Sequence, residues 1–230
     1  MSDMPWRVLH KASASIVRRR LDLEVEGLEN VPAHGPVLIA SRHVHHLYDG
    51  CALLATLPRP AHIIVALDWV TNAAGRVFMD RACRAAAWPV VARTSGPTGV
   101  AVQDAASAFR RAARETLGLW RDGRIVLVFP EGYPNIDPGY TPKHDETEFL
   151  SFQRGYAQLV MMAARQGMRV PIVPVGFSYW RDSRWHAHMR FGAPVYMDDL
   201  CQWEHVASQV ETQVHSLSAW HDHRDETDGA

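Results

Sequence analysis

The sequence has few cysteines and no long apolar run. The first absence argues against a disulfide-stabilised protein, and the second argues against a membrane-spanning one. Its three cysteines lie far apart along 230 residues and form no Cys-x-x-Cys pair. That pattern favours reduced thiols in the cytosol over a disulfide framework. No apolar stretch reaches the roughly 18 residues of a membrane-spanning helix, and the N-terminus lacks the continuous apolar segment of a signal peptide. We therefore expect a reduced protein that does not span a membrane.

The sequence also lacks a basic excess. Its 24 basic and 25 acidic residues give a net charge of −1, so no nucleic-acid partner is expected. Lys11 and Lys143 are the only lysines, and the other basic residues are arginines, which form fixed, bidentate contacts with phosphate or carboxylate. A bias in genomic base composition would produce the same excess. With 47% hydrophobic and 21% charged residues, the chain is of globular type and long enough for one domain with its own core.

Short apolar runs alternate with helical patterns along the whole chain. This alternation indicates an α/β fold: a single domain with a largely parallel central sheet flanked by helices, and an N-terminal amphipathic helix. We expect the helix at 1–22, the domain at 23–200, and a C-terminal helix with a polar tail at 201–230. The predicted strands are 36–40, 62–67, 89–92, 124–129, 170–177 and 194–197, and the predicted inner helices are 51–57, which Asp49 would cap, 103–121, 153–166 and 203–220.

Polar residues follow the ends of two predicted strands, where ligands gather in open α/β sheets. His43, His45, His46 and Asp49 lie within seven residues after the first strand, and Glu131 follows the strand at 124–129. A neutral imidazole can take a proton from an alcohol near pH 7, and a nearby carboxylate can hold its other nitrogen. A lone histidine here would be structural, but three with an aspartate favour a catalytic base.

Three further blocks are individually modest. In Gly75–Arg81, with Arg84 beyond, an arginine on a turn can fork onto a phosphate. In Phe129-Pro130-Glu131-Gly132 a strand ends in a carboxylate on a tight turn, where glycine lets the backbone approach a ligand. In 170–176, two prolines disfavour a central, fully paired strand and fit one that borders an opening. The plain alternatives are surface arginines, an ordinary turn and an edge strand.

In this order, the four blocks resemble the glycerolipid acyltransferase family, which includes the lysophosphatidic acid acyltransferases. The similarity runs from about Leu23 to about Met197, and its most specific parts are Phe78–Arg81 and Phe129–Gly132. The resemblance implies an enzyme of phospholipid biosynthesis. It would move a fatty acyl group from acyl-CoA or acyl-carrier protein to the hydroxyl of a lysophospholipid or related lipid. A histidine base oriented by an aspartate would act without a metal or another cofactor.

By position, the resemblance makes His43 the base and Asp49 its partner. The substrate-binding residues would be Arg81 for an anionic head group, Phe129, Pro130, Glu131 and Gly132 at the acceptor site, and Pro174 near the acyl donor.

The sequence departs from the family in two places. The family has four residues between histidine and aspartate, whereas five separate His43 from Asp49 and three separate His45 from it. The match of Ile-Ala-Ser-Arg-His favours His43 with a one-residue bulge, and His45 stays a candidate. Tyr133-Pro134-Asn135 stands where an arginine often follows, which weakens the case for a glycerophosphate acceptor unless Arg81, Arg84 or Arg93 compensates.

The N-terminal helix suggests contact with the inner, cytoplasmic face of the cell membrane. Trp6, Leu9, Ile16 and Val17 lie near one face with arginines around them, which suits a helix lying in the lipid interface. The alternative is a helix packed on the domain. Two other functions stay open: a metal-dependent hydrolase that uses His43, His45 and His46 as ligands, and a catalytically silent lipid-binding module.

Overall fold

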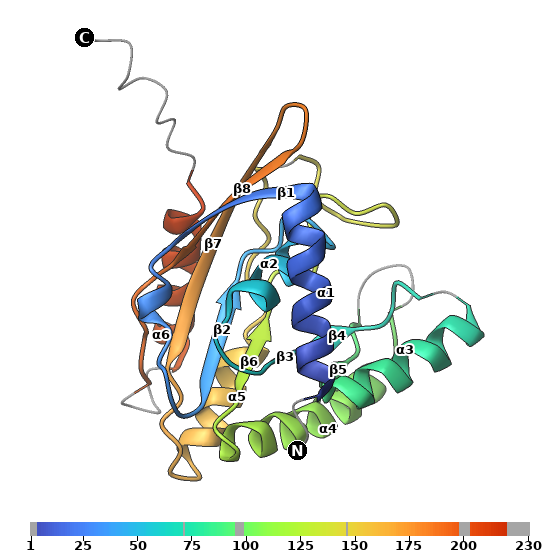
Figure 1. The fold of residues 1–230 in the computed structure, drawn as a ribbon. Helices are drawn as coiled ribbons and strands as arrows, with labels where there is room; N and C mark the ends of the chain where they lie inside the picture. The colour runs from blue at the N-terminus through green and yellow to red at the C-terminus, as the bar shows by residue number, and fades with distance from the viewer. Residues whose placement is uncertain (1–3, 71, 95–98, 146, 198–202, 220–230) are drawn as a thin grey trace.

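The computed structural model describes residues 4–70, 72–94, 99–145, 147–197 and 203–219 (Figure 1). The polar tail from 220 onward and Cys201 lie outside the described residues, while Cys51 and Cys83 are buried free thiols. In chain order the elements are α1 (Met4–Arg20), β1 (Leu21–Glu26), a 3-10 turn (Leu28–Asn30), β2 (Val37–Ser41), α2 (Tyr48–Thr56), β3 (Ala61–Ile63), β4 (Val65–Ala66), α3 (Ala73–Ala86), β5 (Val90–Val91), α4 (Val102–Arg121), β6 (Ile125–Val128), α5 (Gly155–Ala164), β7 (Ile172–Arg181), β8 (Trp185–Phe191) and α6 (Trp203–Leu217).

A six-stranded sheet forms the centre of the domain, with strand order β1-β8-β7-β2-β6-β3 (Figure 1). All neighbouring strands are parallel except β7 and β8, which pair antiparallel. A small second sheet pairs β4 with β5. The predicted fold class, an α/β domain with a largely parallel sheet, is therefore confirmed.

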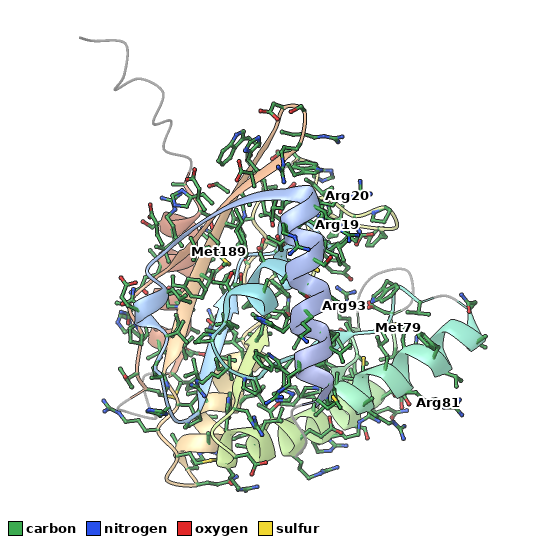
Figure 2. All side chains as sticks on the ribbon, viewed as in Figure 1. Arg19, Arg20, Met79, Arg81, Arg93 and Met189 are labelled. Carbon is green, nitrogen blue, oxygen red and sulfur yellow. The ribbon has the colours of Figure 1, made fainter. Side chains whose placement is uncertain are left out.

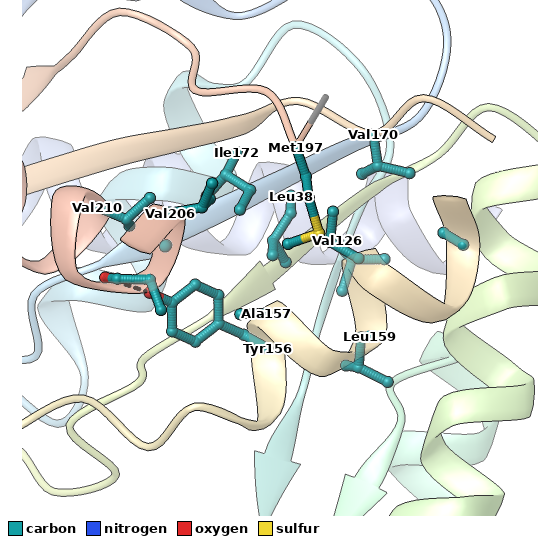
Figure 3. Packing of buried hydrophobic residues seen from close by; sticks show 14 of the residues in the cluster. Leu38, Val126, Tyr156, Ala157, Leu159, Val170, Ile172, Met197, Val206 and Val210 are labelled. Carbon is teal, nitrogen blue, oxygen red and sulfur yellow. Dashed lines mark hydrogen bonds between the residues drawn. The ribbon is translucent and has the colours of Figure 1, made fainter. Parts of the chain in front are cut away.

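Successive residues of the central strands point to opposite faces of the sheet and so feed two cores. Leu38 and Val126 pack on one face against α4, α5 and α6, as Figure 3 shows for part of this cluster. Ile39 and Leu127 pack on the other face, together with residues of α2. In the first core the Tyr156 hydroxyl donates to Ala207 O at 3.1 Å, which ties α5 to α6. The sheet is thus covered on both faces, which keeps its strand ends fixed.

Helix α1 packs on the domain rather than presenting its apolar side outward. It contacts α2, β1 and α3, and Val17 joins the core beneath it. The ring Nδ1 of His10 lies 2.8 Å from Leu54 O, and the Trp6 ring packs on His10 with centroids 5.0 Å apart. The helix therefore packs on the domain, with Trp6, Leu9, Ile16 and Val17 half-buried.

Several predicted elements were wrong in detail. The strand at 194–197 is only an isolated bridge between Val195 and Ile172, whereas β8 was missed. The predicted strand 62–67 is two short strands, β3 and β4, in different sheets. The block around Arg81 lies in α3, not on a turn, because the Asn72 side chain caps that helix through Gly75 N at 2.6 Å.

The two-proline strand is also not at an edge, because β7 pairs with β2 on one side and β8 on the other. Pro174 O accepts from Gly192 N at 2.8 Å, so the missing N–H of Pro174 would face the same side. There β8 has already ended at Phe191, and pairing resumes only at Val195. The proline therefore costs no ladder hydrogen bond, and its side chain is buried.

Gly176 marks the closest approach of α6 to the sheet, and we expect Gly176→Ala to destabilise the fold. A Cβ added there would lie 2.6 Å from the Cβ of Leu217 and closer still to its carbonyl, and backbone on both sides prevents adjustment. Overpacking of this kind costs about 1–3 kcal/mol. Urea unfolding measures the loss.

The matched control is Gly118→Ala in α4, where an added Cβ meets nothing within 4 Å. Alanine should raise the free energy of unfolding there by about 0.5–1 kcal/mol, because it is the better helix former. Equal effects of the two substitutions would contradict the packing of α6 on β7 described here.

Candidate active site

The carboxylate of Asp49, in the first turn of α2, is fully buried and accepts four hydrogen bonds. Its Oδ2 lies 2.9 Å from His43 Nδ1 and accepts from Val44 N at 2.6 Å and His45 N at 2.9 Å. Its Oδ1 accepts from the Tyr179 hydroxyl at 2.7 Å. The sequence suggested that Asp49 caps α2, but its side chain makes no capping hydrogen bond to that helix. Its side chain instead turns back to the loop after β2, and these donors compensate the burial of a charge.

Tyr179, on β7, was not found from the sequence. Burial first, and the neighbouring Asp49 carboxylate second, raise the pKa of Tyr179 well above its usual value of 10. The phenol therefore stays protonated and donates to Asp49 across the working pH range. Tyrosine lies 130 residues from Asp49 in the chain, so no local motif signals the contact.

The ring of His43 is the one that pairs with Asp49. Because Oδ2 accepts at Nδ1, that nitrogen carries the proton, and in a neutral ring the lone pair is on Nε2. Among the described residues none hydrogen-bonds Nε2. The ring stacks on Phe129 with centroids 4.2 Å apart and an interplanar angle of 18°, and the side chain is 15% exposed. The site therefore presents an imidazole that is oriented by a carboxylate and partly accessible to solvent.

His45, the competing candidate, uses its ring differently. Its Nδ1 accepts from Leu47 N at 3.2 Å and from Tyr48 N at 3.4 Å, and the ring stacks on that of Tyr48. Only the backbone N–H of His45 reaches Asp49. Burial lowers the pKa of His45 to about 4, so its ring is neutral at physiological pH. The extra residue between His43 and Asp49 is absorbed because Val44 and His45 both donate to one carboxylate oxygen.

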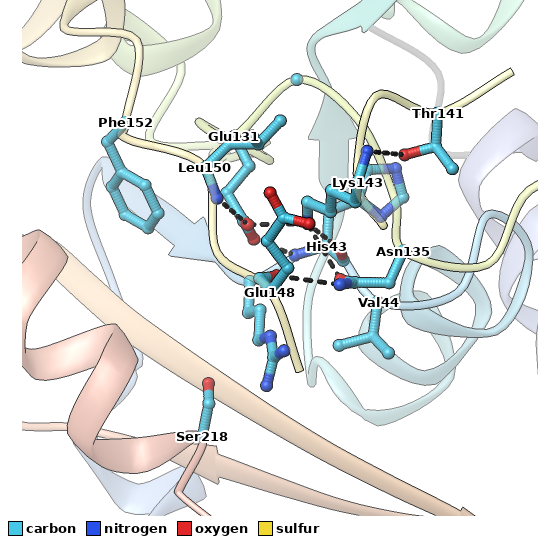
Figure 4. Close-up of polar contacts among 12 residues, drawn as sticks. His43, Val44, Glu131, Asn135, Thr141, Lys143, Glu148, Leu150, Phe152 and Ser218 are labelled. Atoms are coloured by element: carbon cyan, nitrogen blue, oxygen red, sulfur yellow. Dashed lines mark hydrogen bonds and ion pairs between the residues drawn. The ribbon is translucent and has the colours of Figure 1, made fainter. Parts of the chain in front are cut away.

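Glu131, of the Phe-Pro-Glu-Gly block, lies beside the backbone of His43 (Figure 4). Glu131 has a fully buried side chain, whose Oε1 accepts from His43 N at 2.9 Å. Its Oε2 accepts from Leu150 N at 3.1 Å and pairs with Lys143 Nζ at 2.6 Å. Pro130 is buried, and Gly132 has a φ of 79°, in the left-handed region that glycine favours. The Glu131 carboxylate thus contacts the backbone of His43 rather than open space.

Lys143, which pairs with Glu131, was also not predicted as a site residue, although its residue type is unusual for this chain. It is one of two lysines in a chain that otherwise uses arginine, and its side chain is fully buried.

The remaining predicted residues are spread over the domain. Arg81 is exposed on α3, on its lower side in Figure 2, whereas Arg93 lies above that helix. Arg93 pairs with Asp68 through two hydrogen bonds of 2.6 and 2.5 Å, donates to Gly132 O and stacks on Tyr133. It is therefore engaged. The residues that line a cleft of about 330 Å³ around Arg81 are Leu67, Arg76, Val77, Asp80, Arg84, Val90 and Arg111.

Pro174 lies beside Ala40, three residues before His43, in the buried part of the sheet. The structure therefore brings together His43, Asp49, Phe129, Glu131 and Gly132 directly or through shared partners, and it places Arg81 and Pro174 apart from them.

The histidine cluster does not converge on a common point. The Nδ1 atoms of His43, His45 and His46 face Asp49, backbone N–H groups and Ile136 O, respectively. Over the part of the chain that the structure describes, no group of three or more histidine, cysteine, aspartate or glutamate side chains is arranged to hold a metal ion.

A family model described as "Acyltransferase" matches residues 22–178. Eight solved chains match, among them the crystal structure of the 1-acyl-sn-glycerophosphate (LPA) acyltransferase PlsC from Thermotoga maritima. That structure is 19% identical with a TM-score of 0.62, and the match covers 92% of this chain and 77% of the other. No curated protein matches. At this identity the likeness to PlsC concerns the fold.

The depressed pKa of His45 predicts a loss of stability in acid. A histidine whose pKa falls from 6.5 in the unfolded chain to about 4 in the folded one stabilises the fold above pH 6.5. That contribution is lost as the pH falls towards 4. Urea unfolding between pH 7 and pH 4 should show a shallower decline for His45→Gln than for the original chain. The same substitution at the exposed neighbour His46 is the control, and equal slopes for His45→Gln and the original chain would contradict the prediction.

Proposed function

The chain belongs to the acyltransferase family, and we propose that it moves a fatty acyl group from an acyl thioester to the hydroxyl of a lysophospholipid or related lipid. The observation that supports this most is the ring of His43, held at Nδ1 by a buried carboxylate with Nε2 left to act as base. The donor would be acyl-CoA or acyl-carrier protein, and the pathway phospholipid biosynthesis. The reaction needs no metal or other cofactor.

In the proposed step, Nε2 of His43 takes the proton of the acceptor hydroxyl as its oxygen attacks the thioester carbonyl carbon. The imidazolium is stabilised by Asp49, which lies 2.9 Å from Nδ1. As the tetrahedral intermediate collapses, the C–S bond breaks and the imidazolium returns the proton to the thiolate. The products are an ester and a free thiol, and no acyl-enzyme forms.

The cleft around Arg81 supports an anionic acceptor head group. Arg76, Arg84 and Arg111 also line it, and the one carboxylate there, Asp80, pairs with Arg84 at 2.8 Å. Arginine binds phosphate through its planar fork of donors. Arg93 is not a candidate for this role, because Asp68 and Gly132 occupy its donors. We assign head-group binding to Arg81 and the acyl-receiving end to the surroundings of His43 and Phe129.

We expect His43→Ala to abolish transfer and Asp49→Asn to lower kcat by up to about 10⁴-fold, since an asparagine cannot hold the imidazolium as a carboxylate does. The assay offers acyl-CoA or acyl-carrier protein with lysophosphatidate, glycerol 3-phosphate, other lysolipids and glycolipids, and it follows release of the thiol.

His45→Ala is the matched control, since it removes a histidine from the same loop while leaving its backbone donor to Asp49. It should retain measurable turnover. If His43→Ala stays active and His45→Ala does not, the base is His45. A folded protein that binds lipid and turns over no donor would instead be a silent binding module.

We also propose that the enzyme works as a peripheral protein on the cytoplasmic, inner face of the cell membrane. Within the described chain no helix is both long and apolar enough to cross a membrane. Because the apolar side of α1 is packed inward, the contact is assigned to exposed apolar residues on α1 and α3, two helices that touch. These residues are Met4 (67% exposed), Val8 (60%), Val77 (53%) and Phe78 (69%). The arginines beside Val77 and Phe78 suit anionic lipid.

Replacing Val77 and Phe78 together by serine should weaken binding to vesicles that contain anionic phospholipid by about tenfold or more, because burying one such side chain contributes roughly 1.5–3 kcal/mol. Vesicle sedimentation measures this. Val25→Ser, on β1 at the opposite edge of the sheet, is the control for loss of an exposed valine. Unchanged binding of the double variant would remove this surface from the proposal.

A further inference from the structure

A buried ion pair holds both backbone groups of His43 (Figure 4). Glu131 Oε1 accepts from the N–H of His43 at 2.9 Å, and Lys143 Nζ donates to its carbonyl oxygen at 2.9 Å. The two side chains pair with each other at 2.6 Å, and both are fully buried. The N–H and the carbonyl of His43 are therefore both hydrogen-bonded to the two members of one ion pair.

The ammonium of Lys143 has no donor left for a substrate. Its three N–H groups face three acceptors: the Glu131 carboxylate, the His43 carbonyl and Asn135 Oδ1 at 2.9 Å. Burial lowers the pKa of Lys143, and the Glu131 carboxylate opposes that shift. Because its side chain has no exposed surface, this cation cannot replace the arginine that often follows Glu-Gly in the family. Its ammonium contacts the Glu131 carboxylate, the His43 carbonyl and the Asn135 amide oxygen instead.

Lys143 lies on the segment 129–154 between β6 and α5, here called the strap. Two hydrogen bonds hold the strap together internally: Asn135 Nδ2 donates to Asp145 O and Glu148 O, both at 2.8 Å. Other contacts join the strap to the loop after β2. Arg42, beside His43, donates to Thr147 O at 3.2 Å and stacks on Phe149. Backbone bonds join Ile136 to Val44 and His46. Lys143 is thus fixed relative to the candidate base by independent contacts.

Stability alone is a weak reason for such a pair. Removing two charges from water costs several kcal/mol per ion, and apolar residues of similar volume often stabilise a fold as well or better. What apolar residues cannot do is accept from one backbone N–H and donate to the carbonyl of the same residue. The pair is therefore better explained by what it holds than by its own energy.

We propose that Lys143 is a positioning residue for acyl transfer: together with Glu131 it fixes the backbone of His43 so that the ring meets Asp49. The inference rests on the proposed role of His43 as base. Lys143 touches no substrate and acts only through His43. A displacement of about 1 Å in a reacting group lowers turnover by about 10²-fold, and this is the loss that release of the His43 carbonyl should cause.

The test is Lys143→Met in the full chain. We expect kcat to fall by about 10²-fold with KM within about threefold, because binding groups are untouched. Nuclear magnetic resonance of the ¹⁵N-labelled histidine rings provides a readout independent of turnover. The Nδ1–H signal of His43, assigned by its absence in His43→Ala, should shift or broaden. A folded Lys143→Met with wild-type kcat and an unchanged signal would overturn the proposal.

Two controls separate positioning from general loss of structure. Lys11→Met makes the same chemical change at the exposed lysine of α1 and should leave both readouts unchanged. Val210→Ala empties a fully buried position in the core behind α6. It should lower Tm while leaving kcat and the His43 signal as they are. If Val210→Ala changes them as much as Lys143→Met does, Lys143 is merely structural.

If Lys143→Met alone fails to fold, Glu131→Gln with Lys143→Met removes both charges and leaves no unpaired ion. Its reference is Glu131→Gln alone. A further loss of kcat of about tenfold or more relative to that reference supports the proposal, and equal kcat values overturn it. A chain that turns over no substrate refutes the proposed function instead. The histidine signal then still decides whether Lys143 positions His43.

Discussion

The buried carboxylate of Asp49 is the group on which the geometry of the site depends. It has no exposed surface, so its charge must be met by donors from the protein. Those donors come from the loop after β2 and from β7, which are far apart in the sequence. Because two backbone N–H groups converge on one oxygen, the loop is wrapped around the carboxylate. The position of the His43 ring follows from that wrapping, and so does the tolerance of one extra residue between histidine and aspartate.

The sheet provides the frame that makes this possible. The loop after β2 and the loop after β6 emerge at the same edge, because the two strands are parallel neighbours with Ala40 beside Val128. His43 and Glu131 are therefore brought within hydrogen-bonding distance although 88 residues separate them. Helices cover both faces of the sheet, so neither loop moves without disturbing a core. A second buried carboxylate, Glu131, then holds the backbone of the residue whose ring the first one holds.

The parts predicted from sequence were those with a local signal. Apolar runs of strand length predicted β2 and β6, and residues spaced by three and four predicted α4. β8 was missed although Trp185–Phe191 alternates apolar residues with polar ones, the period-two pattern of a half-buried strand. The turn before it, at Asp182 and Arg184, has no glycine or proline to mark a hairpin. The two residues that contact His43 and Asp49 from distant parts of the chain were not predicted, for another reason. Tyr179 and Lys143 meet them across 130 and 100 residues. Their roles exist only once the sheet has formed.

The identity of residue 143 follows from the shape of its surroundings. The chain uses arginine almost everywhere a cation is exposed, whether from genomic bias or for phosphate contacts. At 143 the three acceptors are a carboxylate, a backbone carbonyl and an amide oxygen, each within 2.9 Å of one nitrogen. A tetrahedral ammonium directs three hydrogens from a single point, whereas a guanidinium spreads its donors over a plane of three nitrogens. Lysine therefore fits where arginine does not. The rarest basic residue of the chain stands where a compact charge must satisfy three acceptors at once, one of them the backbone carbonyl of the proposed base.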